Sequence, residues 1–388
     1  MIEKYYDGAI EQVAAGLGTV EKNHLLVRYS GQFSVENLND TKQLEKNEDI
    51  FVQVHEFETG EITCAYEPYL TMICDGFRRY MTGTFEEFME TCDVYYLHRP
   101  VLLGYFNQDN TGREEIILLD EVAYEQERML AALERMLCAI ADRHPVLFVL
   151  NRFQLASKST MQLTARFLKC ENCNIGLVLG VSDIQAMPEF LVPDWEMLYE
   201  TLDDGSKIYH IGNSGRKKEE TIDDEKYVDY GSEKVYRKLQ NMVEFLDFDQ
   251  AAYYLETIER KIKFDNLLVD DAARFRMWLL FVKVSILRQD IPKALEICED
   301  LEKIHLAGKE EECAYEQDYL IATAYMYQGK LKEALEMAGE TYRIAGKMSD
   351  DYRMFLSELL EAKIQMSGWY NIFFCAQDVK IKESLIQN

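Results

Sequence analysis

Short apolar runs alternate with amphipathic stretches along the first half of the chain. The runs are rich in β-branched and aromatic residues and are bounded by polar residues or glycine, which is typical of strands. They cover residues 25–29, 50–57, 146–150, 175–181 and 207–211. The stretches between them predict helices at residues 34–44, 69–81, 121–143 and 157–168. Because the strands are almost continuously apolar, we expect an α/β unit over residues 1–212, with a parallel sheet covered on both faces.

The second half of the chain has an almost wholly helical pattern, and that pattern repeats. Residues 213–232 are rich in glycine and charge and predict a linker ahead of it. Four similar segments mark helix–turn–helix junctions, and their last residues lie 42, 40 and 39 positions apart. They are DFDQAA (247–252), QDIPKA (289–294), GKLKEA (329–334) and GWYNIF (368–373). Such a period predicts an all-α helical-repeat solenoid of four or so helix pairs over residues 233–388.

One of these repeats resembles the tetratricopeptide repeat (TPR). The hydrophobic, small, aromatic, glycine and alanine positions of that family fall on Ile321, Ala322, Tyr325, Gly329 and Ala334. In the preceding repeat, Trp278 and Ala294 stand at the tryptophan and alanine positions. The steps exceed the family's standard length, so we expect longer helices.

The resemblance implies a concave surface that binds a protein or peptide partner through the first helix of each pair. By the family's usual inward positions, this surface would carry Arg276, Lys283, Tyr319, Thr323 and Met326. For Tyr319 and Met326 the alternative is ordinary packing between repeats.

Charge and cysteine usage narrow the class of protein. The chain has 69 acidic and 42 basic residues and a formal charge of −27, which opposes binding to nucleic acid or to anionic membranes. Its nine cysteines show no framework spacing, as expected of reduced thiols. No signal peptide pattern and no membrane-length apolar run is present. We therefore expect a cytoplasmic protein, whose oligomeric state the sequence leaves open.

The order of elements in the first half resembles the nucleotide-binding domain of the STAND class of AAA-related ATPases. The resemblance covers residues 20–212 and includes Tyr66-Glu67-Pro68-Tyr69 after the second strand and Phe153-Gln154-Leu155-Ala156-Ser157 after the third. It implies a P-loop-NTPase-like fold, with a phosphate-binding loop after the first strand and a Walker B carboxylate after the third. With the repeats, the architecture is similar to that of STAND signalling proteins, which sense ligands through such repeats.

The positions that would carry the chemistry depart from that family. Ser30-Gly31-Gln32-Phe33-Ser34-Val35-Glu36-Asn37 follows the first strand and lacks the phosphate-binding lysine and the Mg²⁺-binding hydroxyl at its expected place. Asn151-Arg152 replaces the paired acids, and an amide cannot supply the charge that holds Mg²⁺. Ser182-Asp183 stands where a sensor arginine is expected. Gly31, Ser34 and Asn151 are then only vestigial nucleotide-binding residues, and no catalytic or metal-ligating residue is expected.

Two other motifs carry weak signals. Ile116–Glu121 has the hydrophobic-then-acidic form of a Walker B strand, but it lies just before an amphipathic helix and is better explained as an approach segment with a helix cap. Cys170 and Cys173 have C-x-x-C spacing without a second pair, which favours free thiols and leaves a redox disulfide as the alternative.

These observations favour a non-catalytic regulatory or scaffold protein, a pseudo-ATPase platform with a TPR-like partner-binding surface. We expect it to be no enzyme and to need no cofactor. The alternative is a STAND-type signalling switch that binds ATP or ADP without hydrolysis, with main-chain amides holding the phosphates, and acts on an output partner in trans.

Overall fold

The computed structural model describes residues 2–17, 24–29, 33–46, 49–58, 61–108, 122–170, 174–182, 187–203, 207–211, 229–265, 267–304 and 306–367. The chain divides into two compact units. The first comprises Met1–Asp229 with Arg237–Ala251, and the second comprises Tyr230–Tyr236 with Ala252–Asn388.

A five-stranded parallel sheet forms the centre of the first unit. Its strands are β1 (Leu25–Tyr29), β2 (Phe51–Glu56), β3 (Val146–Asn151), β4 (Ile175–Ser182) and β5 (Lys207–Ile211). They lie in the order β2-β3-β4-β1-β5. All five predicted strands are present to within a residue or so at each end, and the expected parallel sheet is confirmed.

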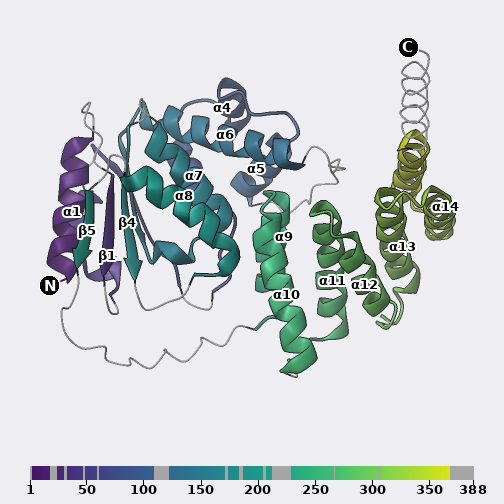
Figure 1. The fold of residues 1–388 in the computed structure, drawn as a ribbon. Coiled ribbons are helices and arrows are strands. Elements are labelled where there is room, and N and C mark those ends of the chain that lie inside the picture. The colour runs from purple at the N-terminus through teal and green to yellow at the C-terminus, as the bar shows by residue number, and fades with distance from the viewer. Residues whose placement is uncertain are drawn as a thin grey trace, which may run out of the picture. The chain divides into compact units, whose positions relative to one another are not determined.

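Helix α1 (Ile2–Gly16) covers one face of the sheet, as Figure 1 shows. Its buried residues are spaced for one helical face and pack against strand residues; they are Tyr6, Ala9, Ile10 and Val13. Close approach is possible because Gly176 of β4 has no side chain: a Cβ there would lie 2.6 Å from Val13 Cγ1. This helix was not among the predicted elements, although the spacing of its apolar residues is a regular helical signal.

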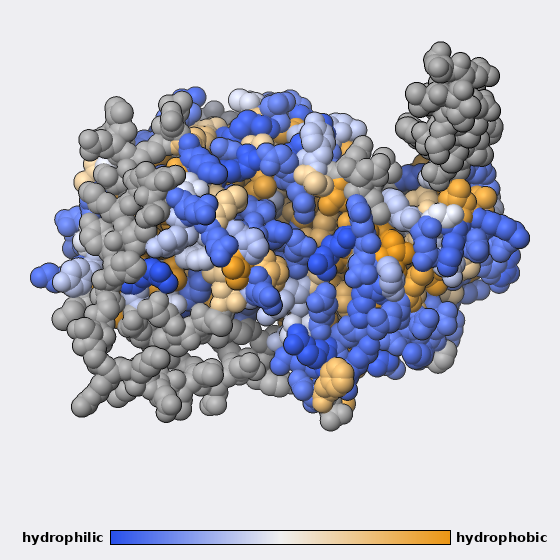
Figure 2. All heavy atoms as spheres, in the orientation of Figure 1, coloured by the Kyte–Doolittle hydropathy of each residue, from blue (hydrophilic) through white to orange (hydrophobic). Residues whose placement is uncertain are grey.

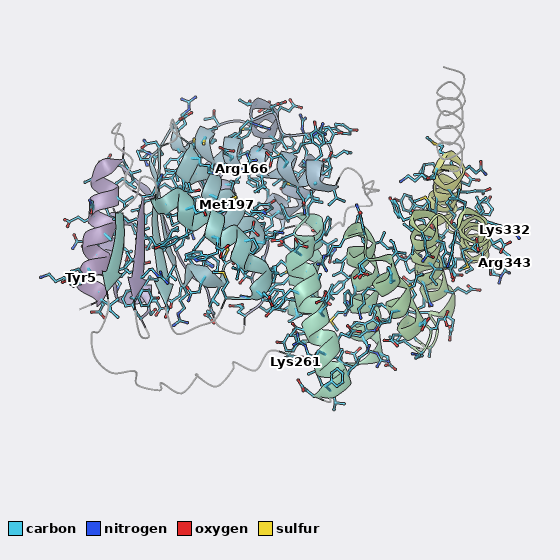
Figure 3. The ribbon with its side chains drawn as sticks, in the orientation of Figure 1. Tyr5, Arg166, Met197, Lys261, Lys332 and Arg343 are labelled. Atoms are coloured by element: carbon cyan, nitrogen blue, oxygen red, sulfur yellow. The ribbon has the colours of Figure 1, made fainter. Side chains whose placement is uncertain are left out.

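The opposite face of the sheet is covered by α3 (Tyr69–Tyr80), α6 (Val122–Ala141) and α7 (Lys158–Lys169), close to the predicted helices. The Tyr69 ring of α3 packs on Phe148 of β3, with 4.7 Å between ring centroids. Arg166 of α7, labelled in Figure 3, forms ion pairs with Glu127 and, at 2.8 Å, with Glu134 of α6. Both faces of the sheet are therefore covered, as the apolar strands predicted.

One predicted helix is broken. Residues 34–44 form a 3₁₀ turn, η1 (Val35–Asn37), and a separate helix, α2 (Asn39–Leu44), because Leu38 between them is extended at ψ 130°. The other elements of this unit are α4 (Phe85–Thr91), α5 (Arg99–Asn107), η3 (Phe153–Leu155), η4 (Glu189–Leu191) and α8 (Val192–Asp203).

Helical elements make up the rest of the described chain. They are α9 (Glu233–Glu244), α10 (Phe248–Phe264), α11 (Asp271–Leu287), α12 (Ile291–Leu301), α13 (Glu310–Tyr327), α14 (Leu331–Met348) and the helical residues 351–367. The α/β region is thus followed by a helical region, as expected. In this division Arg237–Ala251 belongs to the first unit, whereas the sequence pattern placed these residues in the helical repeats. The fourth junction, residues 368–373, lies outside the described residues.

The same turn joins the helices at three of the predicted junctions. Each turn has one residue with left-handed backbone. The N–H of the residue after it donates a hydrogen bond of 2.7–2.9 Å to the carbonyl of the residue five positions earlier in the sequence. Such a bond ends a helix. The left-handed residues are Leu246, Gln289 and Gly329. A fully buried alanine follows each of them by five positions, at Ala251, Ala294 and Ala334. The predicted junctions are therefore real, but in the first one Ala251 takes the equivalent place rather than Ala252.

Candidate functional site

The carboxyl ends of four adjacent strands, β2, β3, β4 and β1, lie at one edge of the sheet. Tyr29 ends β1, Glu56 ends β2, Asn151 ends β3 and Ser182 ends β4. In parallel α/β sheets, ligands bind at this edge, in the loops that follow the strands. We call these four residues and the loop residues that contact them the carboxyl edge.

Asn151 is fully buried, and both ends of its amide are used inside the protein. Its Oδ1 accepts a hydrogen bond from the Tyr29 hydroxyl at 2.6 Å, and its Nδ2 donates to the main-chain oxygen of Phe33 at 3.2 Å. From the sequence, Asn151 was expected to be a vestigial nucleotide-binding residue. In the structure this side chain is buried and its polar atoms are paired with Tyr29 and Phe33.

Three aromatic rings surround this amide. Phe33 lies 5.3 Å from Tyr6 and 5.6 Å from Tyr29 between ring centroids. Both tyrosines are fully buried, and burial raises the pKa of Tyr29 to about 12 and the pKa of Tyr6 well above its usual value. Both phenols are therefore neutral and act as hydrogen-bond groups. Tyr5, next to Tyr6 and labelled in Figure 3, is exposed, as the alternating faces of α1 require.

Gly180 of β4 makes room for this arrangement. It pairs with Val27 of β1 and lies on the strand between β1 and β3. A Cβ at Gly180 would lie 2.4 Å from the Tyr6 hydroxyl and 2.6 Å from Asn151 Oδ1. The glycine therefore lets side chains from α1, β1 and β3 meet above β4.

Glu56 is held by groups from the segments that follow β1 and β3. Its Oε2 accepts hydrogen bonds from the Ser34 hydroxyl at 2.8 Å and from the Val35 N–H at 3.1 Å. Its Oε1 lies 3.3 Å from Nε of Arg152, a residue with left-handed backbone at φ 53°. Ser34, predicted as a vestigial nucleotide-binding residue, therefore binds a carboxylate of its own chain.

The end of β4 is closed in a similar way. The Gln154 side chain donates to the main-chain oxygen of Ser182 at 3.1 Å and accepts from its N–H at 3.3 Å. Both residues are buried. Position 182, where a sensor arginine was expected, thus provides a main-chain anchor for the segment after β3.

Several sequence predictions fall outside the described residues. These are Gly31, Asp183, Ile116–Glu121 and Cys173. Cys170 is half-buried. Within the described ranges, no group of three or more histidine, cysteine or acidic side chains could hold a metal ion. In the same ranges, no helix combines the length and the apolar character needed to cross a membrane.

The segment Arg237–Ala251 is attached to the start of α7. Asp247 is buried, and its Oδ2 accepts from the Ser159 N–H at 3.1 Å, near the positive end of the α7 dipole. Burial raises the pKa of Asp247, opposed by its hydrogen bonds to Ser159. Asn241 Oδ1 accepts from the Ala65 N–H at 3.2 Å, and the Lys238 ammonium pairs with Glu61 at 2.8 Å. This attachment depends on distant residues, so no local sequence signal could show it.

The five predicted partner-binding residues of the second unit differ in their surroundings. Arg276 is exposed, pairs with Glu233 at 2.8 Å and lies over the Tyr236 ring. Lys283 is half-buried. Figure 2 shows hydrophobic residues within a mostly hydrophilic surface over α11 and α13.

The other three lie on α13. The Thr323 hydroxyl is half-buried and donates to the Tyr319 main-chain oxygen at 2.8 Å, while the Tyr319 ring stacks on Tyr315 at 6.0 Å. Met326 is only 8% exposed and packs in a cluster with Ala322 and Ala334. For Met326 the structure therefore supports packing between helices, and we remove it from the partner surface.

Comparison of the chain with protein-family models, with curated proteins and with solved structures finds no match. Function is therefore inferred from the residues themselves.

Proposed function

We propose that this protein is a non-catalytic regulatory or scaffold protein. In this proposal a degenerate STAND/AAA-type, P-loop-NTPase-like unit is a platform, and TPR-like repeats bind a protein or peptide partner. The observation that carries it is the pairing of Asn151 with Tyr29 and Phe33 at the end of β3. A nucleotide hydrolase needs a carboxylate there to hold Mg²⁺, whereas here a buried amide ties three parts of the chain together.

The surroundings of Asn151 support the same proposal. Among the described residues of the carboxyl edge, Glu56 carries a carboxylate, and Arg152 neutralises its charge. Bare Mg²⁺ prefers octahedral oxygen ligands and keeps several waters, which needs open space. The buried rings of Tyr6, Tyr29 and Phe33 fill the space beside the amide instead.

The partner-binding part of the proposal rests on the first helices of the repeat pairs. Arg276 and Lys283 on α11 and Tyr319 and Thr323 on α13 remain its candidate residues. In a chain with a net charge of −27, the exposed Arg276 and the half-buried Tyr319 are suited to a partner that combines acidic and apolar groups. The cysteines described as free, such as Cys74 and Cys298, are compatible with the reducing cytoplasm that the proposal assumes.

A titration of the purified chain with fluorescent ATP and ADP, with and without Mg²⁺, tests the platform directly. We expect no binding at high micromolar nucleotide and no nucleotide in the purified protein. Tight, Mg²⁺-dependent binding would overturn the proposal.

Affinity capture tests the repeats. We expect a partner of the wild-type chain, taken from its own cells, to be lost from the double variant Arg276→Ala/Lys283→Ala and kept by Lys332→Ala. Lys332 lies on α14 and is exposed, so it is a matched control for loss of positive charge. Equal capture by all three proteins would move the partner surface elsewhere.

A second candidate function is a switch that binds nucleotide without hydrolysing it. Its support is the contact of Glu56 with the Ser34 hydroxyl, the Val35 N–H and Arg152, since these are groups that also bind phosphate oxygens. The same titration decides between the two, because the switch requires wild-type protein to bind ATP or ADP.

A further inference from the structure

Three donors converge on one carboxylate at the carboxyl edge. The Ser34 hydroxyl and the Val35 N–H contact one oxygen of Glu56 at 2.8 and 3.1 Å, and the Arg152 guanidinium lies 3.3 Å from the other. A hydroxyl, a main-chain N–H and a guanidinium form charge-assisted hydrogen bonds to carboxylate and phosphate alike. The three donors would therefore bind an anion from solution if the Glu56 carboxylate moved away from them.

The donors come from segments far apart in the sequence. Ser34 and Val35 follow β1, Arg152 follows β3, and Glu56 ends β2. The side chains of Glu56 and Arg152 are 18% and 25% exposed. Both thus reach water, so the carboxylate can leave the donors and be solvated without crossing the core.

A fourth donor lies nearby. The Tyr6 hydroxyl is fully buried and has no hydrogen-bond partner among the described residues. A Cβ on Gly180 would contact both this hydroxyl and Asn151 Oδ1, which places Tyr6 among the groups of the carboxyl edge. Burying a hydroxyl without a hydrogen-bond partner is unfavourable, so one more acceptor at this edge would stabilise the folded state.

We propose that Ser34, the Val35 N–H and Arg152 form an anion-binding site whose resident anion is the Glu56 carboxylate, and that the site takes a phosphate-bearing ligand when this carboxylate moves away. Glu56 then acts as an internal competitor. A tethered group has an effective concentration in the millimolar range or above, so the apparent affinity of wild-type protein for phosphate is lowered accordingly.

The experiment is thermal unfolding of the full-length chain in inorganic phosphate and in chloride at equal ionic strength. A ligand that binds the folded state raises the melting temperature with its concentration. We expect phosphate to stabilise Glu56→Ala with an apparent affinity at least about tenfold higher than for wild type. Glu45→Ala, an exposed acid at the end of α2, controls for the loss of one negative charge and should behave as wild type.

Two further variants locate the binding. Glu56→Ala/Arg152→Met should lose the response to phosphate, because the guanidinium supplies the positive charge. Glu56→Gln keeps the side-chain volume. Its affinity for phosphate should lie between those of Glu56→Ala and wild type, because its amide still accepts a hydrogen bond from Ser34 but no longer attracts Arg152. A folded Glu56→Ala and a folded Glu56→Gln that both ignore phosphate would overturn the inference, as would an undiminished response in the double variant.

The outcome is independent of the platform proposal. Mg²⁺-dependent nucleotide binding by the wild-type chain would contradict the platform proposal. The present inference would still be tested by the response of the Glu56 variants to inorganic phosphate. Pyrophosphate and citrate, tested on Glu56→Ala, distinguish a phosphate ligand from a carboxylate ligand.

Discussion

The Tyr29 hydroxyl donates to Asn151 Oδ1 at 2.6 Å, although β1 and β3, the strands that these residues end, are not neighbours. The bond passes over β4 at Gly180. It joins the segment after β1 to the segment after β3, where a nucleotide hydrolase keeps its phosphate loop and its metal-binding acid apart. We therefore expect this contact to stabilise the carboxyl edge.

Gly180→Ala should strongly destabilise the protein. The new Cβ would lie 2.4 Å from the Tyr6 hydroxyl and 2.6 Å from Asn151 Oδ1, so rings and amide must shift. We expect a loss of about 2–4 kcal/mol in the free energy of unfolding, from overpacking and a weakened hydrogen bond. Urea titration followed by circular dichroism measures it.

Gly339→Ala is the matched control. Gly339 lies in α14, and a Cβ added there would have no neighbour within 4 Å, so alanine should stabilise by about 0.5–1 kcal/mol. Equal effects of the two substitutions would show that Gly180 does not make room for the Tyr29–Asn151 contact.

Asn151→Asp restores an acid at the end of β3 and should not restore metal binding. The carboxylate would be fully buried and would lose the donor that Asn151 gives to Phe33. We expect a loss of about 2–4 kcal/mol at neutral pH, because the charge is desolvated and faces the Phe33 main-chain oxygen. The measurement is urea unfolding with and without Mg²⁺. Stabilisation by Mg²⁺ would mean that the site is open to solvent, contrary to the structure.

Asp247→Ala should loosen the attachment of Arg237–Ala251 to α7. It removes the acceptor of the Ser159 N–H at the start of that helix, which costs about 1–2 kcal/mol. Asp249→Ala is the control, since the Asp249–Lys158 pair is partly exposed and should be worth about 0–1 kcal/mol. Hydrogen exchange of the α7 amides measures the effect of both substitutions. Unchanged exchange in Asp247→Ala would exclude a capping role.

Asp318 should make the stability depend on pH in the weakly acidic range. Burial, together with Glu340 and Glu302, raises its pKa from 3.8 to about 6. The folded state therefore binds the proton more tightly than the unfolded state, and stability falls as the pH rises from about 4 to 6. Because the side chain is half-exposed, the change should be no more than about 1–2 kcal/mol.

Asp318→Asn should remove this dependence. The variant should be more stable than wild type at pH 7.5 and equal to it at pH 4, as measured by urea titration at both values. Glu311→Gln, an exposed acid on the same helix, should show no such difference. A variant advantage that is the same at both pH values would point to packing rather than to the charge of Asp318.

Local patterns were enough to predict the strands and the junctions of the helices. The five strands are short apolar runs between polar residues, and the burial of β1, β3 and β4 on both faces follows from that composition. The turns at Gln289 and Gly329 end helices by local hydrogen bonds, so they too leave a mark in the sequence. The amide at Asn151, in place of an acid, was visible from its position after the third run.

The tertiary structure alone decided what those residues contact. Tyr6 reaches the carboxyl edge because α1 lies on the sheet at Gly176 and Gly180, and Asp247 joins the first unit because it meets Ser159. Met326 is buried because a neighbouring helix covers it. A periodic pattern reports which face of an element is apolar, since that depends on the element alone. Which partner fills that face depends on residues distant in the sequence, and only the folded chain brings them together.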